Sequence, residues 1–220
     1  MNFHVITIFP PAFDSYLKES IIGRAIKNKK ISIKFYNPRD FTSAKDWYKQ
    51  VDDRPYGGGP GMVMQAEPLL KATAKALSSS KGKNKKTKII IFSPSGKKFT
   101  NEYAKNLAKK YMDIIMISGR YEGIDARVKK ILKAEDVSIG DYVLTGGELP
   151  AMVLIDSTAR QIEGVLHKSE SLEESRTSSS EVYTRPEKLV YKGKSYKVPK
   201  VLLSGNHKDI EAWKKKRSVI

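Results

Sequence analysis

One stretch of the sequence decides the fold, Ser138-Ile-Gly-Asp-Tyr-Val-Leu-Thr-Gly-Gly-Glu-Leu-Pro150. It is apolar enough to be buried, yet it carries three glycines, a proline and two carboxylates. The glycines let another backbone or a ligand come close. Loops normally lie on the surface because their backbone polar groups need partners. The stretch therefore indicates either a tight turn before a helix that begins near Glu148, or a loop whose N–H and C=O groups face a ligand.

The elements around this stretch alternate between strands and helices. Apolar, β-branched runs predict strands over residues 3–9, 31–36, 88–92 and 113–117, and residues 136–139 lead into the opening stretch. Helical spacing predicts helices over residues 12–27, 68–77, 101–110, 124–132 and 149–160. The strands near Ile91 and Ile115 are continuously apolar, which is typical of a parallel sheet with helices on both faces. We therefore predict an α/β fold with a mostly parallel sheet.

Glycine-containing turns follow three successive strands, at residues 93–96, 118–123 and 140–147. In open α/β sheets, ligands bind at the carboxyl ends of the strands. We therefore expect these three loops to converge and to form one pocket. This convergence favours the ligand interpretation of the opening stretch over the tight turn.

The composition indicates a polyanionic partner. Lys and Arg number 41 against 24 Asp and Glu, so the formal net charge is +17. A charge of this size attracts polyanions, nucleic acid first and an anionic membrane surface second. The scattered Lys-Lys pairs fit a merely Lys-rich composition as well. The chain has no cysteine, which excludes disulfides and cysteine-ligated metal sites. No apolar run approaches the ~20 residues of a membrane span, so we expect a cytoplasmic protein without a membrane partner.

A second unusual loop covers residues 51–61, with four glycines and two prolines beside charged and aromatic residues. Such a loop either cradles an anion on its backbone N–H groups or is a mobile solvated segment. It is neither a Walker P-loop nor a dinucleotide fingerprint. Arg54 and Tyr56 form a pair capable of stacking, of the kind that RNA-binding surfaces use.

The last third of the chain differs in kind. We expect a first domain over residues 1–162, and residues 163–182 are polar and low in complexity, which predicts a flexible interdomain linker. Residues 183–220 follow as a small basic domain. It holds a strand pair around residues 190–191 and 196–198, a turn at Lys192-Gly-Lys194, and a basic helix over residues 208–217.

The sequence resembles one family closely, the bacterial tRNA (guanine-N1)-methyltransferases, which belong to the knotted methyltransferases that use S-adenosylmethionine. The matching runs cover nearly the whole chain in the order of the family. They are Ile8-Phe-Pro10, Pro38-Arg-Asp-Phe41, residues 51–62, 118–125 and 138–152, Tyr183-Thr-Arg-Pro186 and residues 202–207.

The resemblance implies an α/β sheet with a deep C-terminal trefoil knot, and the opening stretch would be the knot loop. It implies a homodimer with active sites at the subunit interface, a tail that grips the tRNA anticodon arm, and methylation of the guanine immediately 3′ of the anticodon, guanine-37. The residues that it implies for binding S-adenosylmethionine are Ser93, Pro94, Gly119, Tyr121, Glu122, Ile139, Gly140, Asp141, Tyr142, Val143, Leu144, Gly146, Gly147 and Pro150.

The chemistry needs a base, because guanine N1 carries a proton in its ground state. In the family, the base is an aspartate in an acidic-Asp-Ser-aromatic run within the linker. The nearest match here is residues 173–176, so Glu174 is the predicted base, with Glu173 and Glu170 as alternatives. Glutamate replaces aspartate, and Arg176 stands where an aromatic residue is usual. Arg160 matches the arginine of the family and is expected to stabilise charge on O6.

The resemblance also implies magnesium, for which Glu122 is a candidate ligand unless it forms an ion pair; the metal site stays open. The candidate RNA-binding residues are Arg54, Tyr56, Arg185 and His207. Two classes of function follow, a tRNA methyltransferase and a non-catalytic RNA-binding protein on the same fold. A nucleotide-binding enzyme such as a kinase or dehydrogenase ranks last, because both phosphate-binding motifs are missing.

Overall fold

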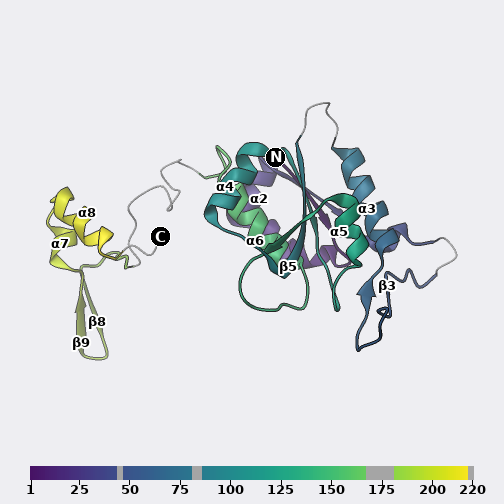
Figure 1. Ribbon diagram of the computed structural model, residues 1–220. Coiled ribbons are helices and arrows are strands. Elements are labelled where there is room, and N and C mark those ends of the chain that lie inside the picture. Colours follow the sequence, from purple (N-terminus) through teal and green to yellow (C-terminus); the bar gives the residue numbers. More distant parts are fainter. Residues whose placement is uncertain (44–46, 81–85, 167–180, 218–220) are drawn as a thin grey trace. The chain divides into compact units, whose positions relative to one another are not determined.

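A five-stranded parallel sheet forms the centre of the first part of the chain in the computed structural model (Figure 1). The structure describes residues 1–43, 47–80, 86–166 and 181–217. The strand order is β2-β1-β6-β5-β7, and every neighbouring pair is parallel, as predicted. The strands are β1 (Asn2–Ile6), β2 (Ser32–Tyr36), β5 (Thr87–Lys98), β6 (Asp113–Ile117) and β7 (Glu135–Ser138).

Helices cover both faces of this sheet (Figure 1). One face carries α1 (Asp14–Leu17), α2 (Ser20–Lys27), α4 (Asn101–Lys110) and α6 (Glu148–Ala159), and the other carries α3 (Ala66–Ser79) and α5 (Ala126–Leu132). Strand β6 shows why two layers are needed, because its side chains alternate between two buried clusters. Ile114 and Met116 belong to the first cluster, and Ile115 and Ile117 belong to the second.

The predicted helix over residues 12–27 is wrong in its continuity. The chain forms a 3-10 helix, η1 (Pro10–Phe13), and then the separate helices α1 and α2. Ser20 has a φ of 49°, which a continuous right-handed helix does not contain. The apolar spacing that predicted one helix is still buried on one face, because Phe13, Leu17 and Ile22 all lie in the first cluster.

The terminal turn predicted at residues 93–96 is also wrong. Strand β5 continues to Lys98 through an irregularity between Phe92 and Lys97, both of which pair with Val137 of β7. Gly96 permits this close return, since a Cβ there would lie 2.5 Å from the Val137 nitrogen. The segment therefore bulges at the carboxyl end of the sheet and pairs again.

The glycine-rich loop is bounded by a small antiparallel hairpin that the sequence did not predict. Its strands are β3 (Asp52–Asp53) and β4 (Val63–Met64). Earlier in the chain, η2 (Pro38–Phe41) is capped by Asn37, whose side chain accepts a hydrogen bond from Arg39 N.

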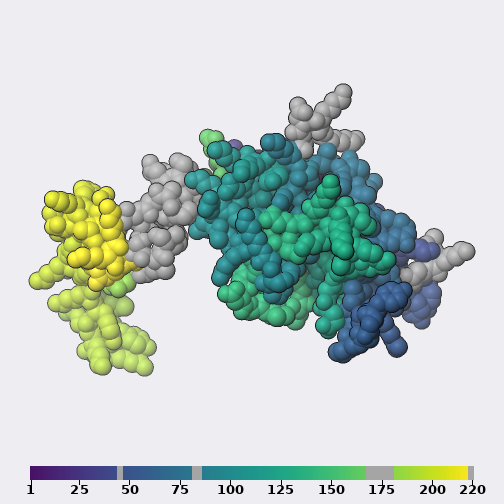
Figure 2. Space-filling view, in the orientation of Figure 1, coloured from purple at the N-terminus to yellow at the C-terminus, as the bar shows by residue number. Residues whose placement is uncertain are grey.

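The chain divides into two compact units, Met1–His167 and Lys168–Ile220, so the division falls inside the predicted linker. The described start of that linker belongs to the first unit, because Val165 packs against the first cluster. The second unit holds β8 (Lys188–Tyr191), β9 (Lys194–Lys197), α7 (Lys200–Leu203) and α8 (His207–Lys215). The hairpin of β8 and β9 projects from the helices of its own unit (Figure 2).

A buried polar cluster ties the amino ends of β1 and β6 together. Asp113 Oδ1 lies 3.1 Å from His4 Nε2 and accepts a 2.9 Å hydrogen bond from Asn2 Nδ2. The other ring nitrogen of His4 lies 3.0 Å from the Tyr36 hydroxyl. Burial acts to raise the pKa of Asp113, but the neighbouring side chains of Ser80, Asn2 and His4 outweigh it and hold that pKa below its usual value.

We expect Asp113→Asn to lower the free energy of unfolding by about 1–3 kcal/mol at pH 7, because it weakens hydrogen bonds to a buried charged group. The unfolded chain binds this proton more readily than the folded one. The contribution is therefore present above the ordinary carboxyl range, near pH 4, and is lost as the pH falls below it. Urea unfolding of both proteins at pH 7 and pH 3 measures this difference.

Asp14→Asn is the control, since it removes an exposed carboxylate that pairs with Lys18 at 2.9 Å. That variant should change stability little at either pH. An Asp113→Asn difference that is the same at both pH values would contradict the charged role of the buried cluster.

Candidate active site

The irregular segment of β5 at residues 93–96 and the glycine-containing loops after β6 and β7 surround one cavity of about 460 Å³. They meet because β6, β5 and β7 are neighbours in the sheet, so their carboxyl ends lie at the same edge. The volume lies within the ~300–1,000 Å³ of small-molecule sites. The predicted convergence of the three loops is thus observed.

The residues predicted to bind the donor line this cavity, with the exception of Asp141. The Asp141 side chain is 88% exposed, and its Oδ2 lies 3.3 Å from Lys98 Nζ. The residues that the structure brings together are Ser93, Pro94, Gly119, Tyr121, Glu122, Ile139, Gly140, Tyr142, Val143, Leu144, Gly146, Gly147 and Pro150. Their role as ligands of the donor stays a prediction.

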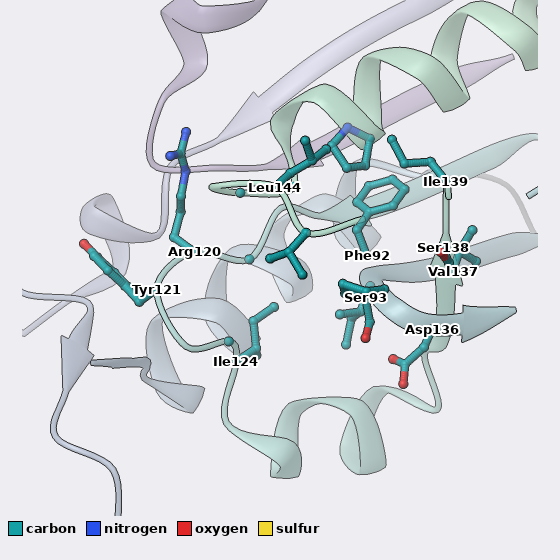
Figure 3. A pocket seen from close by; sticks show the side chains of 18 of the residues that line it. Phe92, Ser93, Arg120, Tyr121, Ile124, Asp136, Val137, Ser138, Ile139 and Leu144 are labelled. Atoms are coloured by element: carbon teal, nitrogen blue, oxygen red, sulfur yellow. The ribbon is translucent and has the colours of Figure 1, made fainter. Parts of the chain in front are cut away.

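Apolar side chains next to the predicted loops also line the cavity and were missed from the sequence. They are Ile91, Phe92, Ile124 and Val137. Figure 3 shows Phe92, Ile124, Val137 and Leu144 around a common space, with Tyr121 at its edge. The missed residues immediately adjoin the predicted loops, so the end of each apolar run was the signal that pointed to them.

Two charged pairs fix the polar side of the cavity. Lys129 Nζ lies 2.5 Å from Asp136 Oδ2. Asp125 caps α5 by accepting a 2.9 Å hydrogen bond from Arg127 N. The side-chain and backbone hydrogen bonds from Arg127 hold the pKa of Asp125 below its usual value. Asp125 is therefore ionised at neutral pH and fixes the end of the 118–125 loop.

Two of the loops touch through their backbones. Gly147 N donates a 2.9 Å hydrogen bond to Gly119 O, and Arg120 bridges Gly146 in an antiparallel sense. A Cβ on Gly147 would lie 2.6 Å from the Ser118 Cα, so only glycine permits this approach. The sequence predicted that Gly147 lets a ligand come close, and the structure shows that it also lets a neighbouring backbone come close.

Glu148 lies next to this backbone contact and stabilises it from the buried side. It was missed from the sequence as a site residue. Its side chain is 5% exposed, and its Oε2 lies 3.0 Å from Arg120 Nε. Its Oε1 accepts a 2.7 Å hydrogen bond from the Thr7 hydroxyl. The Arg120 guanidinium in turn lies 4.6 Å from the ring centre of Phe9. The carboxylate therefore joins the segment after β1, the loop after β6 and the start of α6.

The glycine-rich loop is attached to the cavity through backbone hydrogen bonds. Glu122 N donates to Met62 O at 3.0 Å, and Met64 N donates to Gly123 O at 2.9 Å. Arg54 and Tyr56 lie at the exposed part of this loop, and Tyr56 is fully exposed. The structure thus places the candidate RNA-contacting pair on a loop that adjoins the cavity.

The predicted catalytic residues are only partly described. Arg160 lies at the C-cap of α6. Glu174 and its alternatives Glu173 and Glu170 lie outside the described residues. Arg185 and His207 are exposed in the second unit, where His207 is the first residue of α8.

No group of three or more His, Asp or Glu side chains that could hold a metal ion occurs within residues 1–43, 47–80, 86–166 and 181–217. The magnesium site that the resemblance implies stays a prediction. Across the same residues, no helix has both the length and the apolar character that crossing a membrane requires.

The fold and the cavity define a class of protein, an open parallel α/β protein with a small-molecule site at the carboxyl ends of adjacent strands. The family model of the tRNA (Guanine-1)-methyltransferases matches residues 1–220. The chain belongs to this family, and the resemblance noted in the sequence is confirmed.

Individual relatives agree with this assignment. The chain is 46% identical over 221 residues to the tRNA (guanine-N(1)-)-methyltransferase of Pseudoalteromonas atlantica, which covers 99% of this chain and 80% of the relative. It is 44% identical over 223 residues to the enzyme of that name from Clostridioides difficile, covering 100% and 93%. It is 47% identical over 221 residues to that of Buchnera aphidicola, covering 99% and 89%.

The ion pair between Arg120 and Glu148 should show a strong energetic coupling. We expect a double-mutant cycle with Arg120→Met and Glu148→Gln to give a coupling of roughly 1–3 kcal/mol, because each single variant leaves a mostly buried charge without its partner. Urea unfolding of the four proteins measures it.

The exposed pair of Lys98 and Asp141 gives the matched control, with Lys98→Gln and Asp141→Asn. Its coupling should stay below about 1 kcal/mol. Equal couplings for the two pairs would contradict the view that Glu148 holds the loops together.

Proposed function

We propose that this protein transfers a methyl group from S-adenosylmethionine to N1 of guanine-37, the guanine immediately 3′ of the anticodon in tRNA. The observation that carries the proposal is the three-loop cavity in a chain that belongs to the tRNA (guanine-1)-methyltransferase family. The +17 charge supports a tRNA partner and a cytoplasmic location, where tRNA is found.

The residues of the cavity fit the methyl donor. A purine ring needs apolar contacts, which Phe92, Ile139 and Leu144 offer. Its edge needs hydrogen-bonding groups, which the backbone of the 138–147 loop offers. The carboxylate of Glu122 suits the positive charge of a sulfonium, whereas that of Asp136 is already paired with Lys129. When bound, the donor supplies a methyl group that the sulfonium activates towards a nucleophile.

A trefoil knot around the 118–123 and 140–147 loops is part of the proposal. The backbone contact between Gly147 and Gly119 supports it, because the loops after β6 and β7 touch directly although β5 lies between the two strands. Knots are rare exceptions among folds. A knotted loop would be held from both sides, which suits a site that binds its ligand through fixed backbone groups.

Two side chains carry the chemistry that we propose. The carboxylate of Glu174 removes the N1 proton, which frees the lone pair that bonds to the methyl carbon. The bond from that carbon to sulfur breaks at the same time, and the demethylated donor leaves with the electron pair. Such a base typically contributes ~10²–10⁴-fold in rate. The guanidinium of Arg160 stabilises the negative charge that develops on O6. Glu173 and Glu170 remain the alternatives for the base.

The tRNA contacts that we propose lie on both units. Arg54 and Tyr56 lie on the glycine-rich loop, one end of which adjoins the cavity, and Tyr56 offers an exposed ring to an unstacked base. Arg185 and His207 are exposed on the small basic unit. This division leaves methyl transfer to the first unit and much of the tRNA binding to the second.

A homodimer is supported by α6, which has apolar residues on all sides. Its inner side is buried against the sheet, yet Leu149 is 57% and Val153 42% exposed. A helix that is hydrophobic all round is normally buried. Two aromatic residues earlier in the chain are also exposed, Phe9 just before η1 and Tyr16 in α1. The Tyr16 hydroxyl hydrogen-bonds to Asp156 of α6. We propose that a second copy of the chain covers this surface.

The function is tested with purified protein, a labelled methyl donor and two tRNA transcripts that differ only in guanine or adenine at position 37. We expect 1-methylguanosine only with the guanine transcript. Arg160→Ala and Glu174→Gln should each lower the rate by at least about 100-fold, because each removes a group that acts in the transition state. Nucleoside chromatography measures the product.

Calorimetry with the demethylated donor is the control, and both variants should bind it as the parent does. Tight tRNA binding without methylation by the parent protein would instead favour the non-catalytic RNA-binding alternative.

The dimer is tested with Val153→Glu, which places a charge on the exposed side of α6. We expect sedimentation to show a monomer and methylation to fall at least about tenfold, since burying an unpaired charge in an interface is unfavourable. Ile131→Glu is the control, because Ile131 is also an exposed apolar residue, at 62%, and lies on α5 at the other face of the sheet. A dimer that survives Val153→Glu with full activity would contradict this interface.

A further inference from the structure

The hairpin of β8 and β9 is exposed on both of its faces. All eight of its strand residues are exposed, including Leu189, Val190, Tyr191 and Tyr196. An isolated two-stranded hairpin is only marginally stable in water, and exposed apolar side chains in a cluster usually mark a contact surface. The hairpin therefore has the character of a surface that meets a partner.

The strand pairing sorts these side chains into two faces. Leu189 lies opposite Tyr196, and Tyr191 lies opposite Lys194. Because side chains alternate along a strand, these four share one face. The other face carries Lys188 opposite Lys197, and Val190 opposite Ser195. One face is thus mainly aromatic and apolar, and the other begins with a pair of lysines.

The lysine pair is unfavourable in the isolated hairpin. Like charges directly opposite each other on a sheet destabilise it. Among the described residues, no carboxylate forms an ion pair with Lys188 or Lys197, and the sequence has no Asp or Glu between Lys188 and Lys208. The same stretch holds further lysines at positions 192, 194 and 200. An anion between the two opposed lysines would convert their repulsion into attraction.

We propose that the β8–β9 hairpin is an RNA-binding ribbon of this enzyme, with Lys188 and Lys197 on backbone phosphates and Tyr191 and Tyr196 stacked on unpaired bases. The proposal rests on the function proposed above and names the part of the second unit that contacts the tRNA. Lys192 already lies 5.5 Å from the centre of the Tyr191 ring, so cation and aromatic surface are joined at the tip.

The pattern of side chains fits RNA better than a protein or a membrane. The ribbon offers cations and aromatic rings on opposite faces, with Lys194 beside the two tyrosines and the opposed lysines on the other face. This combination suits single-stranded nucleic acid, because every base has a face for stacking and a phosphate beside it. A membrane-binding face would be continuously apolar, whereas Lys194 lies on the aromatic face. A tight turn at Lys192 and Gly193, with φ values of 48° and 73°, keeps the ribbon narrow enough to follow a backbone.

The phosphate contacts are tested with the double variant Lys188→Gln and Lys197→Gln. This change removes the repulsion, so the hairpin should be at least as stable, and weaker binding cannot be attributed to its unfolding. Binding of a tRNA transcript is measured by fluorescence anisotropy over a range of KCl concentrations. We expect the slope of log affinity against log salt to fall by roughly 1.4–1.8, which corresponds to two phosphates.

The matched control is Lys105→Gln with Lys109→Gln on α4. These two exposed lysines are four residues apart on one helix, so the control also removes two charges and one repulsion. Its salt slope should stay close to that of the parent protein. An equal loss of slope in the control and the hairpin variant would show a general charge effect and overturn the ribbon.

The stacking contacts are tested with Tyr191→Leu and Tyr196→Leu together, which keep an apolar side chain and remove the ring. We expect at least about fivefold weaker tRNA binding at every salt concentration, with the salt slope unchanged, because stacking is not ionic. The KM for tRNA in the methylation assay should rise by a similar factor. Circular dichroism confirms that the variant is folded.

Unchanged tRNA affinity in both hairpin variants would overturn the ribbon while leaving the methyltransferase intact. Vesicles with anionic lipid serve as the second probe, and a loss of vesicle binding without a loss of tRNA binding would assign the hairpin to a membrane. Failure of the methyltransferase proposal would look different, since the parent protein would then form no 1-methylguanosine whatever the hairpin carries.

Discussion

The buried carboxylate of Glu148 is the constraint on which the cavity depends. A carboxylate that is 4% exposed is unfavourable unless it is paired and hydrogen-bonded. Its partners are Arg120 at 3.0 Å and Thr7 at 2.7 Å, which come from the loop after β6 and the residue after β1. The position at the first turn of α6 adds the favourable field of a helix N-terminus. Pairing the Glu148 carboxylate therefore holds together three segments that are far apart in the sequence, and the cavity lies beside these segments.

The backbone contact between Gly147 and Gly119 explains why the site is built from backbone more than from side chains. Gly147 must come within hydrogen-bonding distance of Gly119, and any side chain there would collide with Ser118. Loops brought this close have few degrees of freedom left, so their remaining N–H and C=O groups point in fixed directions. Fixed dipoles bind a ligand without the entropy loss of ordering long side chains. The charged side chains of Arg120 and Glu148, by contrast, stabilise the loops through their ion pair.

Patterns local in the sequence predicted much of the fold, and long-range contacts explain what they missed. The apolar runs around Ile91 and Ile115 predicted strands of the parallel sheet, and the glycines after these runs predicted where the cavity lies. Glu148 could not be found this way, because its partner Thr7 lies 141 residues away and nothing near either residue reveals the pair. The bulge in β5 was missed for a similar reason, since Gly96 is required only once β7 lies beside it. Asp141 shared a run with residues of the cavity, yet its side chain turns outwards to Lys98.

The two kinds of electrostatic contact in this protein respond differently to salt. The pair of Glu148 and Arg120 is largely excluded from water, so mobile ions screen it little. The lysines of the β8–β9 hairpin are exposed, and at a Debye length of about 8 Å at physiological salt their attraction to a polyanion is strongly screened. We therefore expect the cavity to keep its shape over a range of salt in which the proposed RNA binding weakens greatly. An enzyme that must release each methylated tRNA benefits from this separation, because weak and screened contacts can let go of the product while the buried ones keep the site assembled.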